Sequence, residues 1–149
     1  FKEQGTSTLA LLFTANKGAQ SGALKKVASG GELSRIMLSI KAVLASYKKL
    51  PTLIFDEIDT GVSGEIAQQM AQIMGQMSDS MQVFSITHLP QIAAKGTQQI
   101  KVYKEDVNNV TNTQLKQLTE EERIVEIAQM IGGHTLTDSA LAHARQLRN

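Results

Sequence analysis

Cysteine and tryptophan are absent from this sequence of 149 residues, and proline occurs only 2 times. Without cysteine the chain can form neither a disulfide nor a thiolate metal site. No apolar run approaches the ~20 residues needed to cross a bilayer, and the opening FKEQGTSTLA lacks the basic and apolar regions of a secretory signal. We therefore expect a cytoplasmic protein without a membrane partner.

The sequence also lacks an excess of positive or negative charge. The chain has 15 basic and 14 acidic residues, so its net charge is +1. This balance gives no field that would attract nucleic acid. Hydrophobic residues make up 42% and charged residues 19%, which is typical of an ordinary globular chain rather than a disordered one.

The middle of the chain alternates strand-like and helix-like patterns. Helical spacing from Gly31 to about Tyr47 predicts an amphipathic helix, and a second helix follows over Ile66–Met77. Leu53–Phe55 and Met81–Ile86 are short apolar runs, typical of strands buried on both faces. The expected buried stripe of the first helix comprises Leu33, Ile36, Met37, Ile40 and Leu44.

The two ends of the chain carry further elements. Ser7–Thr14 is expected to form a strand and residues 15–23 a loop. A polar-faced hairpin is predicted over Gln98–Glu105 and Thr111–Leu118, around Asn108-Asn109. Thr119 and Glu122 form a capping box that opens a helix ending at Gly132-Gly133, and Asp138–Leu147 is expected to be the last helix.

The order strand, helix, strand, helix predicts an α/β fold with a mostly parallel central sheet, right-handed crossovers and flanking helices, in a single domain over residues 1–149. Ligands bind such sheets at the carboxyl ends of the strands. Asp56, Glu57 and His88 all fall at those ends. Two strands are therefore expected to bring reactive side chains to one edge of the sheet.

The segment Ser29-Gly30-Gly31-Glu32 marks the start of the first helix. Ser29 and Glu32 have capping-box spacing, which is a purely structural explanation. It does not explain two glycines in the first turn, each of which costs about 1 kcal/mol against alanine in a helix. Glycines favour close approach of another group, and a helix N-terminus favours a phosphate. Both interpretations stay open on this motif alone.

Asp56-Glu57 ends an apolar strand, and His88 follows the next one. An acidic pair is also common in a solvated loop, and a lone histidine is more often structural than catalytic. At a sheet edge, however, one carboxylate can hold Mg²⁺ and its neighbour can orient or deprotonate water. His88 could donate to a terminal phosphate oxygen there.

Taken together, the motifs and their order resemble one family, the ABC ATPases. ASGGE stands at the place of the family's signature, LIFDEID resembles Walker B with its D-loop, and ITH resembles the switch-histidine segment. Glutamate after the glycines is more typical of the chromosome-maintenance (SMC-like) branch than of transporters. The resemblance is specific from about Leu24 to Ala94 and weaker from there to the end.

The resemblance implies a mechanism in which two heads sandwich two ATP molecules. Asp56 would help hold Mg²⁺, Glu57 would activate water, and His88 would contact the γ-phosphate of the same head. The signature residues Ser29, Gly30, Gly31 and Glu32 would act on the nucleotide of the second head of a homodimer, and Asp59 of the D-loop would cross between the heads. In the parent protein this cycle would serve DNA double-strand-break repair and recombination at the nucleoid, with DNA as a partner.

A phosphate loop, G-x-x-x-x-G-K-[ST], is missing from the sequence, as is a long heptad pattern. Since the related proteins carry the phosphate loop in an N-terminal part separated by a coiled coil, we expect this chain to be the C-terminal half of a split P-loop head. Its first partner is then the N-terminal half of its own head. Alone, the chain is expected to be inactive as an ATPase.

Two other functions remain open at this point. The chain could be a non-catalytic head-association module, which the missing phosphate loop favours and the carboxylate pair beside His88 disfavours. It could also be a stand-alone metal-dependent hydrolase using Asp56, Glu57 and Asp59, although further histidine or carboxylate ligands would then be expected.

Overall fold

The computed structural model describes residues 5, 10–107, 110–133 and 135–149, apart from the side chain of Ser46. These residues form a mixed α/β structure with a parallel strand pair and helices, as predicted. Its elements in chain order are β1 (Leu12–Phe13), β2 (Gly22–Ala23), α1 (Leu24–Val27), α2 (Gly30–Lys48), β3 (Thr52–Asp56), α3 (Gly64–Ser78), β4 (Gln82–Ile86), α4 (Pro90–Ala93), β5 (Ile100–Val107), β6 (Val110–Gln117), α5 (Glu120–Gly132) and α6 (Asp138–Arg148).

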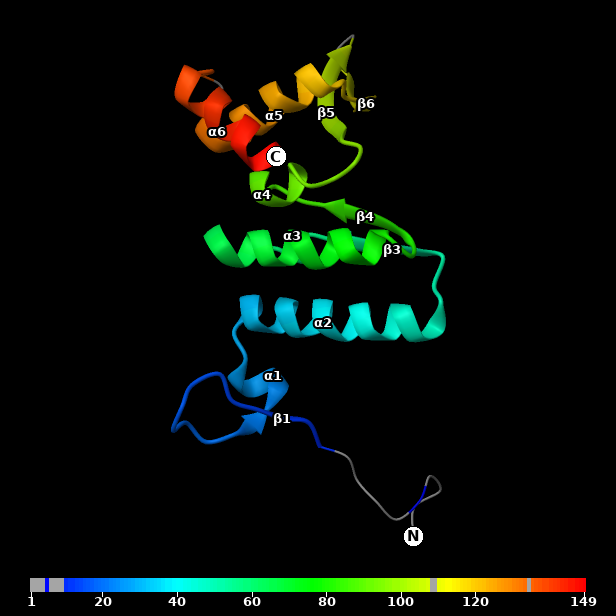
Figure 1. Cartoon of the computed structure of the whole chain (residues 1–149), viewed down its shortest axis with the longest axis vertical. Helices are drawn as coiled ribbons and strands as arrows, with labels where there is room; N and C mark the ends of the chain where they lie inside the picture. The colour runs from blue at the N-terminus through cyan, green and yellow to red at the C-terminus, as the bar shows by residue number, and fades with distance from the viewer. Residues whose placement is uncertain (1–4, 6–9, 108–109, 134) are drawn as a thin grey trace.

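The centre of the fold is the parallel pair β3–β4, with α3 as the crossover between the strands. Helices α2 and α3 run side by side in the middle of the molecule, and α4, α5, α6 and the β5–β6 hairpin lie at the end opposite β1 and α1 (Figure 1). Near the N-terminus β1 pairs antiparallel with β2. The described part of the strand expected over Ser7–Thr14 is thus a short piece, and residues 7–9 lie outside the described residues.

The main core fills the space between α2, α3 and the inner face of the strands. Helix α3 supplies most of it, because small and flexible side chains recur along one of its faces. Phe55 of β3 and Leu38 of α2 are almost completely buried against this face. The members contributed by α3 are Ala67, Met70, Ala71, Met74 and Met77.

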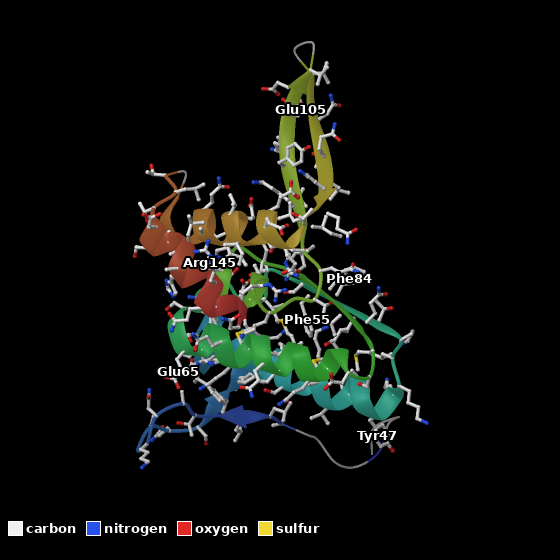
Figure 2. The ribbon with its side chains drawn as sticks, turned by 45° about the horizontal axis from the view of Figure 1, so that its top comes forward. Tyr47, Phe55, Glu65, Phe84, Glu105 and Arg145 are labelled. Carbon is white, nitrogen blue, oxygen red and sulfur yellow. The ribbon has the colours of Figure 1, made fainter. Side chains whose placement is uncertain are left out.

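Two expectations about burial are wrong. Strands β3 and β4 are buried on one face only: Ile54 is 61% exposed, and Phe84 and Ile86 are also exposed. Figure 2 shows the two labelled phenylalanines, of which Phe55 is buried and Phe84 is exposed. Helix α2 is apolar on more than one side, and α3 covers the side that carries Leu38 and Ala45. Most of the stripe expected to be buried is therefore exposed, namely Leu33, Met37, Ile40 and Leu44.

The C-terminal elements form a second, smaller core. Its buried side chains come from α5, α6 and the end of α4, and alanines let these helices approach closely. The predicted capping box at Thr119 and Glu122 is confirmed. The predicted hairpin is confirmed as β5–β6, and its expected turn at Asn108-Asn109 lies outside the described residues. Figure 2 shows the hairpin projecting from the helices, with Glu105 toward its tip.

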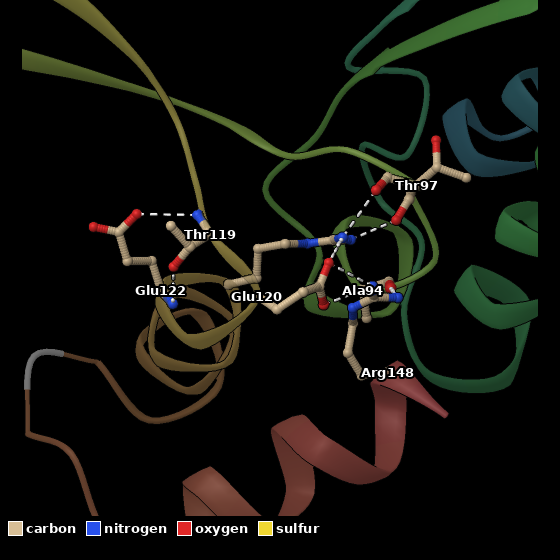
Figure 3. Close-up of polar contacts among 8 residues, drawn as sticks. Ala94, Thr97, Thr119, Glu120, Glu122 and Arg148 are labelled. Atoms are coloured by element: carbon tan, nitrogen blue, oxygen red, sulfur yellow. Dashed lines mark hydrogen bonds and ion pairs between the residues drawn. The ribbon is translucent and has the colours of Figure 1, made fainter.

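A buried arginine joins this second core to the loop after α4. Arg123 of α5 is 1% exposed. It donates hydrogen bonds to the carbonyl oxygens of Gly96 and Thr97, the latter at 3.0 Å, and to Glu120 at 2.7 Å. Arg148 of α6 donates to the same Glu120 carboxylate at 2.9 Å and to the carbonyl of Ala94 at 3.2 Å (Figure 3). The two guanidinium groups, Arg148 foremost, hold the pKa of the Glu120 carboxyl below its usual value.

We expect Arg123→Met to lower the free energy of unfolding by about 2–4 kcal/mol, because methionine fills the space but leaves two carbonyl groups without their charged donor. Urea unfolding followed by circular dichroism measures the change. Arg145→Met in α6 is the matched control, since Arg145 is exposed and such a change is worth about 0.5 kcal/mol or less. An equal effect of both substitutions would contradict a structural role for the Arg123 contacts.

Candidate functional site

The parallel pairing of β3 and β4 brings the predicted acidic pair and the predicted histidine to the same edge. Asp56 is the register partner of Ile86, the last residue of β4. The next residue, Glu57, donates its backbone N–H to the Ile86 carbonyl at 3.0 Å. His88 follows Ile86 by two residues, and all three side chains of the predicted set are exposed. The edge thus presents two carboxylates and an imidazole to solvent.

Glu57 has an unusual backbone conformation for this edge. Its φ angle is 47°, in the left-handed region that side-chain-bearing residues seldom adopt. The Glu57 carbonyl accepts hydrogen bonds from the N–H of Thr60 at 3.3 Å and from the Thr60 hydroxyl at 2.9 Å, which hold this turn in place. Such locally strained residues cluster at functional sites. The backbone of Glu57 is therefore held in one conformation by hydrogen bonds to Ile86 and Thr60.

The glycine-containing segment forms the N-terminus of α2, as predicted. Ser29 is the N-cap, and the capping box is complete. The carboxylate of Glu32 accepts hydrogen bonds from the backbone N–H and from the hydroxyl of Ser29, both at 2.7 Å. These two bonds, with a smaller contribution from Arg35, hold the pKa of the Glu32 carboxyl below its usual value. Ser29 and Glu32 thus fix the geometry of this helix end.

The two glycines of this helix end have different surroundings. A Cβ atom added at Gly30 would meet nothing within 4 Å. A Cβ added at Gly31 would lie 3.1 Å from the carbonyl oxygen of Gly61, in the turn that follows the acidic pair. Gly31 therefore lets the start of α2 pack against that turn, whereas Gly30 leaves space open to solvent. Of the two, only Gly30 has no contact within the described part of the chain that would require a glycine.

Asp59, which the resemblance places between two heads, is buried in this chain. Its side chain is 1% exposed, and its Oδ2 accepts a hydrogen bond from the hydroxyl of Thr87. Thr87 precedes His88 in the ITH motif, and the motif analysis gave it no role of its own. The sequence indicates this role only weakly: a threonine hydroxyl can form a hydrogen bond with the backbone N–H two residues later, here that of Leu89. The exposed residues of the turn are Thr60 and Gly61.

Other features of the described residues bear on the alternatives. No three histidine, aspartate or glutamate side chains among them lie close enough together to hold a metal ion. The buried Asp59 thus does not join the exposed Asp56 and Glu57 in one ligand set. A groove of about 610 Å³ lies elsewhere, between α3, α4 and α6, and none of its lining residues belongs to the predicted site. No helix in the described part of the chain has the length and apolar character of a membrane span.

Comparison with solved structures defines the class of fold. The chain superposes with a TM-score of 0.61 and 19% identity on a structure from work on ATP-driven dimerization and DNA-stimulated activation of SMC ATPases, covering 79% of this chain and 70% of that one. An SMC head bound to the C-terminal winged-helix domain of ScpA gives a TM-score of 0.58 at 23% identity, covering 70% of this chain and 31% of that one. The fold is that of SMC ATPase heads.

Comparison with curated proteins gives the particular relatives. The chain is 43% identical to the DNA repair protein RecN of Bacillus subtilis over 145 residues, or 97% of this chain and 25% of that protein. It is 43% identical to RecN of Deinococcus radiodurans and 41% identical to RecN of Haemophilus influenzae, in each case over 96% of this chain.

The chain is therefore similar to RecN proteins over nearly its whole length, and it spans about a quarter of the length of these relatives. A scan against protein-family models gave no match.

Proposed function

We propose that this chain is one half of an ATP-hydrolysing head in a DNA repair protein, and that the head works as a dimer. The observation that carries the proposal is the edge formed by Asp56, Glu57 and His88, in a chain that has the fold of SMC ATPase heads and is similar to RecN. Its substrate is ATP with Mg²⁺. The relatives are DNA repair proteins. As the resemblance of its motifs implies, the whole protein would act in double-strand-break repair and recombination on DNA in the cytoplasm, at the nucleoid.

Asp56 is the proposed Mg²⁺ ligand. It is an exposed carboxylate at the end of β3, and no hydrogen bond or ion pair within the described residues occupies it. One such oxygen donor fits Mg²⁺, which takes few protein ligands and completes its shell with phosphate and water oxygens. When bound, the ion neutralises charge on the phosphates. The residues of the chain position the remaining groups around it.

Glu57 is the proposed general base. Its backbone is held by β4 and by Thr60, so its carboxylate can stand beside the metal ligand and accept a proton from an attacking water. We assign to His88, which follows the neighbouring strand, a hydrogen bond to the γ-phosphate of the same head; the shared sheet edge supports this role. These roles need a phosphate held by backbone amides and a lysine, which the N-terminal half of the head would supply.

The N-terminus of α2 is the proposed contact with the second head. Its free N–H groups and helix dipole favour a phosphate group, and the open space around Gly30 lets that group approach. Ser29 and Glu32 hold the end of the helix in shape, and Gly31 allows its packing on Gly61. In the turn after β3, the exposed Thr60 and Gly61 would face the second head, while the side chain of Asp59 is buried.

The exposed apolar faces support a partner in the same head. Ile54, Phe84 and Ile86 form the open face of the β3–β4 pair, and Val43 and Tyr47 continue the exposed apolar side of α2. Exposed apolar surface of this kind marks sites of association. We assign these faces to the N-terminal half of the head, which would complete the sheet and cover α2.

We expect this chain alone to bind ATP too weakly to detect at micromolar concentration and to hydrolyse none, because its sequence has no phosphate-loop motif. The complete head consists of this chain and the N-terminal half. We expect the complete head to bind and to hydrolyse ATP. Isothermal titration calorimetry and phosphate release measure them. Micromolar ATP binding by this chain alone would contradict the division of the head into two halves.

The second candidate function is a non-catalytic association module. The exposed apolar faces favour it as well, since they need only a partner and no nucleotide. The two functions differ in one outcome. If the complete head assembles but neither binds nor hydrolyses ATP, the association module is the better description of this chain.

A further inference from the structure

Asp59 is a buried carboxylate with an unusual environment. It lies in the turn after β3, and 1% of its surface is exposed. Its Oδ2 accepts the hydrogen bond from Thr87, and its Oδ1 accepts none from the described residues. Burial of a carboxylate with an unmatched oxygen is costly, and a structural position of this kind is better served by a neutral side chain. The hydrogen bond from Thr87 is therefore the one side-chain contact among the described residues that compensates for the burial of this carboxylate.

Thr87 connects this carboxylate to the backbone around His88. Its hydroxyl donates to Asp59 and accepts the backbone N–H of Leu89 at 3.0 Å. The two hydrogen bonds lie on either side of His88 in the sequence, so they define the backbone conformation from which the imidazole projects. His88 itself is exposed, so its position depends on the backbone that carries it.

The turn that carries Asp59 is itself well fixed. The Asp59 carbonyl accepts the N–H of Val62 at 3.1 Å. Val62 is buried in the main core, and Gly61 contacts the start of α2. Asp59 is therefore a rigid point of attachment, while the segment after β4 depends on side-chain contacts for its placement.

We propose that Asp59 is a positioning residue that acts through Thr87 to hold His88 at the edge shared with Asp56 and Glu57. The proposal rests on the ATPase function given above, because His88 is the group that would meet the γ-phosphate. Asp59 touches neither nucleotide nor metal in this role. It fixes the distance between the turn after β3 and the segment after β4.

The test compares Thr87→Val with Thr87→Ser in the complete head. Valine has the shape of threonine but lacks the hydroxyl, so both hydrogen bonds are lost, whereas serine keeps them. We expect Thr87→Val to lower kcat about 10- to 100-fold with KM for ATP changed less than about threefold, since misplacing a catalytic group costs rate rather than binding. Thr87→Ser should restore most of the lost kcat. Asp59→Asn, which keeps an acceptor of the same shape, should lose less than Thr87→Val.

The double variant Thr87→Val with His88→Ala separates positioning from general destabilisation. If Thr87 acts through His88, the double variant should turn over ATP no more slowly than His88→Ala alone. Additive losses, or equal losses in Thr87→Ser and Thr87→Val, would overturn the proposal. A rise in KM with an unchanged kcat would do the same.

Hydrogen exchange read by mass spectrometry on the complete head gives a result that does not depend on ATP turnover. Thr87→Val should speed exchange in the peptide that contains Leu89 and should leave exchange in peptides of α5 unchanged. Thr87→Ser should leave exchange in both sets of peptides unchanged. If His88→Ala keeps the wild-type kcat, the role of His88 in the proposed function fails, while the exchange data still decide whether Asp59 and Thr87 hold this segment. Unchanged exchange at Leu89 in Thr87→Val would overturn the positioning role.

Discussion

Glu57→Gln in the complete head should stop ATP turnover while ATP binding persists. Glutamine is nearly the same size as glutamate and can keep the backbone hydrogen bonds of residue 57 to Ile86 and Thr60. It cannot accept the proton of an attacking water, and general-base catalysis is worth about 10²–10⁴-fold in rate. ATP should then accumulate between two heads and hold them together. Phosphate release and sizing chromatography with and without Mg-ATP measure the two effects.

Two further variants make this result specific. Glu121→Gln removes the same charge from an exposed position in α5, far along the chain from the edge, and should leave turnover unchanged. Asp56→Asn should weaken the binding of Mg-ATP itself, because it removes charge from the proposed metal ligand. A Glu57→Gln head that hydrolyses ATP at the wild-type rate, or stays monomeric with ATP, would remove Glu57 from the catalytic role and favour the association module.

The arrangement of the fold was largely predictable because its signals are local. Helix caps at Ser29 and Thr119 depend on residues three positions apart, and both capping boxes are present. The strand–helix–strand order fixed the parallel pairing and thus the shared edge of Asp56 and His88. Four-residue helices such as α1 and α4 carry too few residues for a periodic pattern, and they were missed.

Burial was harder to predict than secondary structure because it depends on partners. Ile54 and Leu44 have the apolar character of core residues, yet they are exposed in the described structure. Their apolar patterns would also arise if the proposed N-terminal half of the head covers them, and burial of that kind cannot be read from the structure of one chain. The same limit applied to Asp59, whose inward orientation follows from a contact with Thr87, 28 positions away.

The glycines of the signature segment show a similar mixture. Their presence at a helix start indicated close approach of another group, and within the described residues such an approach is present at Gly31 only. Gly31 serves a contact within the chain, with Gly61. The space at Gly30 is open, so the contact with a nucleotide stays a prediction that concerns Gly30 more than Gly31.

Ser29→Arg should abolish hydrolysis by the complete head while its own ATP binding persists. The arginine would fill the space that Gly30 leaves open and that the nucleotide of the second head is proposed to enter. We expect a loss of at least about 100-fold, the size seen when a preorganised donor to a transition state is removed. Ser29 is also the N-cap of α2, whose loss costs about 1 kcal/mol. Ser29→Ala, which loses the hydroxyl without adding bulk, is therefore the matched control and should keep most of the turnover.

Mixing two inactive variants gives the sharpest form of this prediction. In a dimer of one Ser29→Arg head and one Glu57→Gln head, one of the two sites combines an intact Glu57 with an intact Ser29 from the opposite head. Random mixing in equal amounts makes half of the dimers mixed, so roughly a quarter of the wild-type turnover should return if the two sites of the symmetric dimer work independently. If Ser29 instead acts on the nucleotide of its own head, every site in the mixture lacks one of the two residues. No recovery of phosphate release, with dimers demonstrated by sizing chromatography, would therefore show that the proposed action of Ser29 on the second head is wrong.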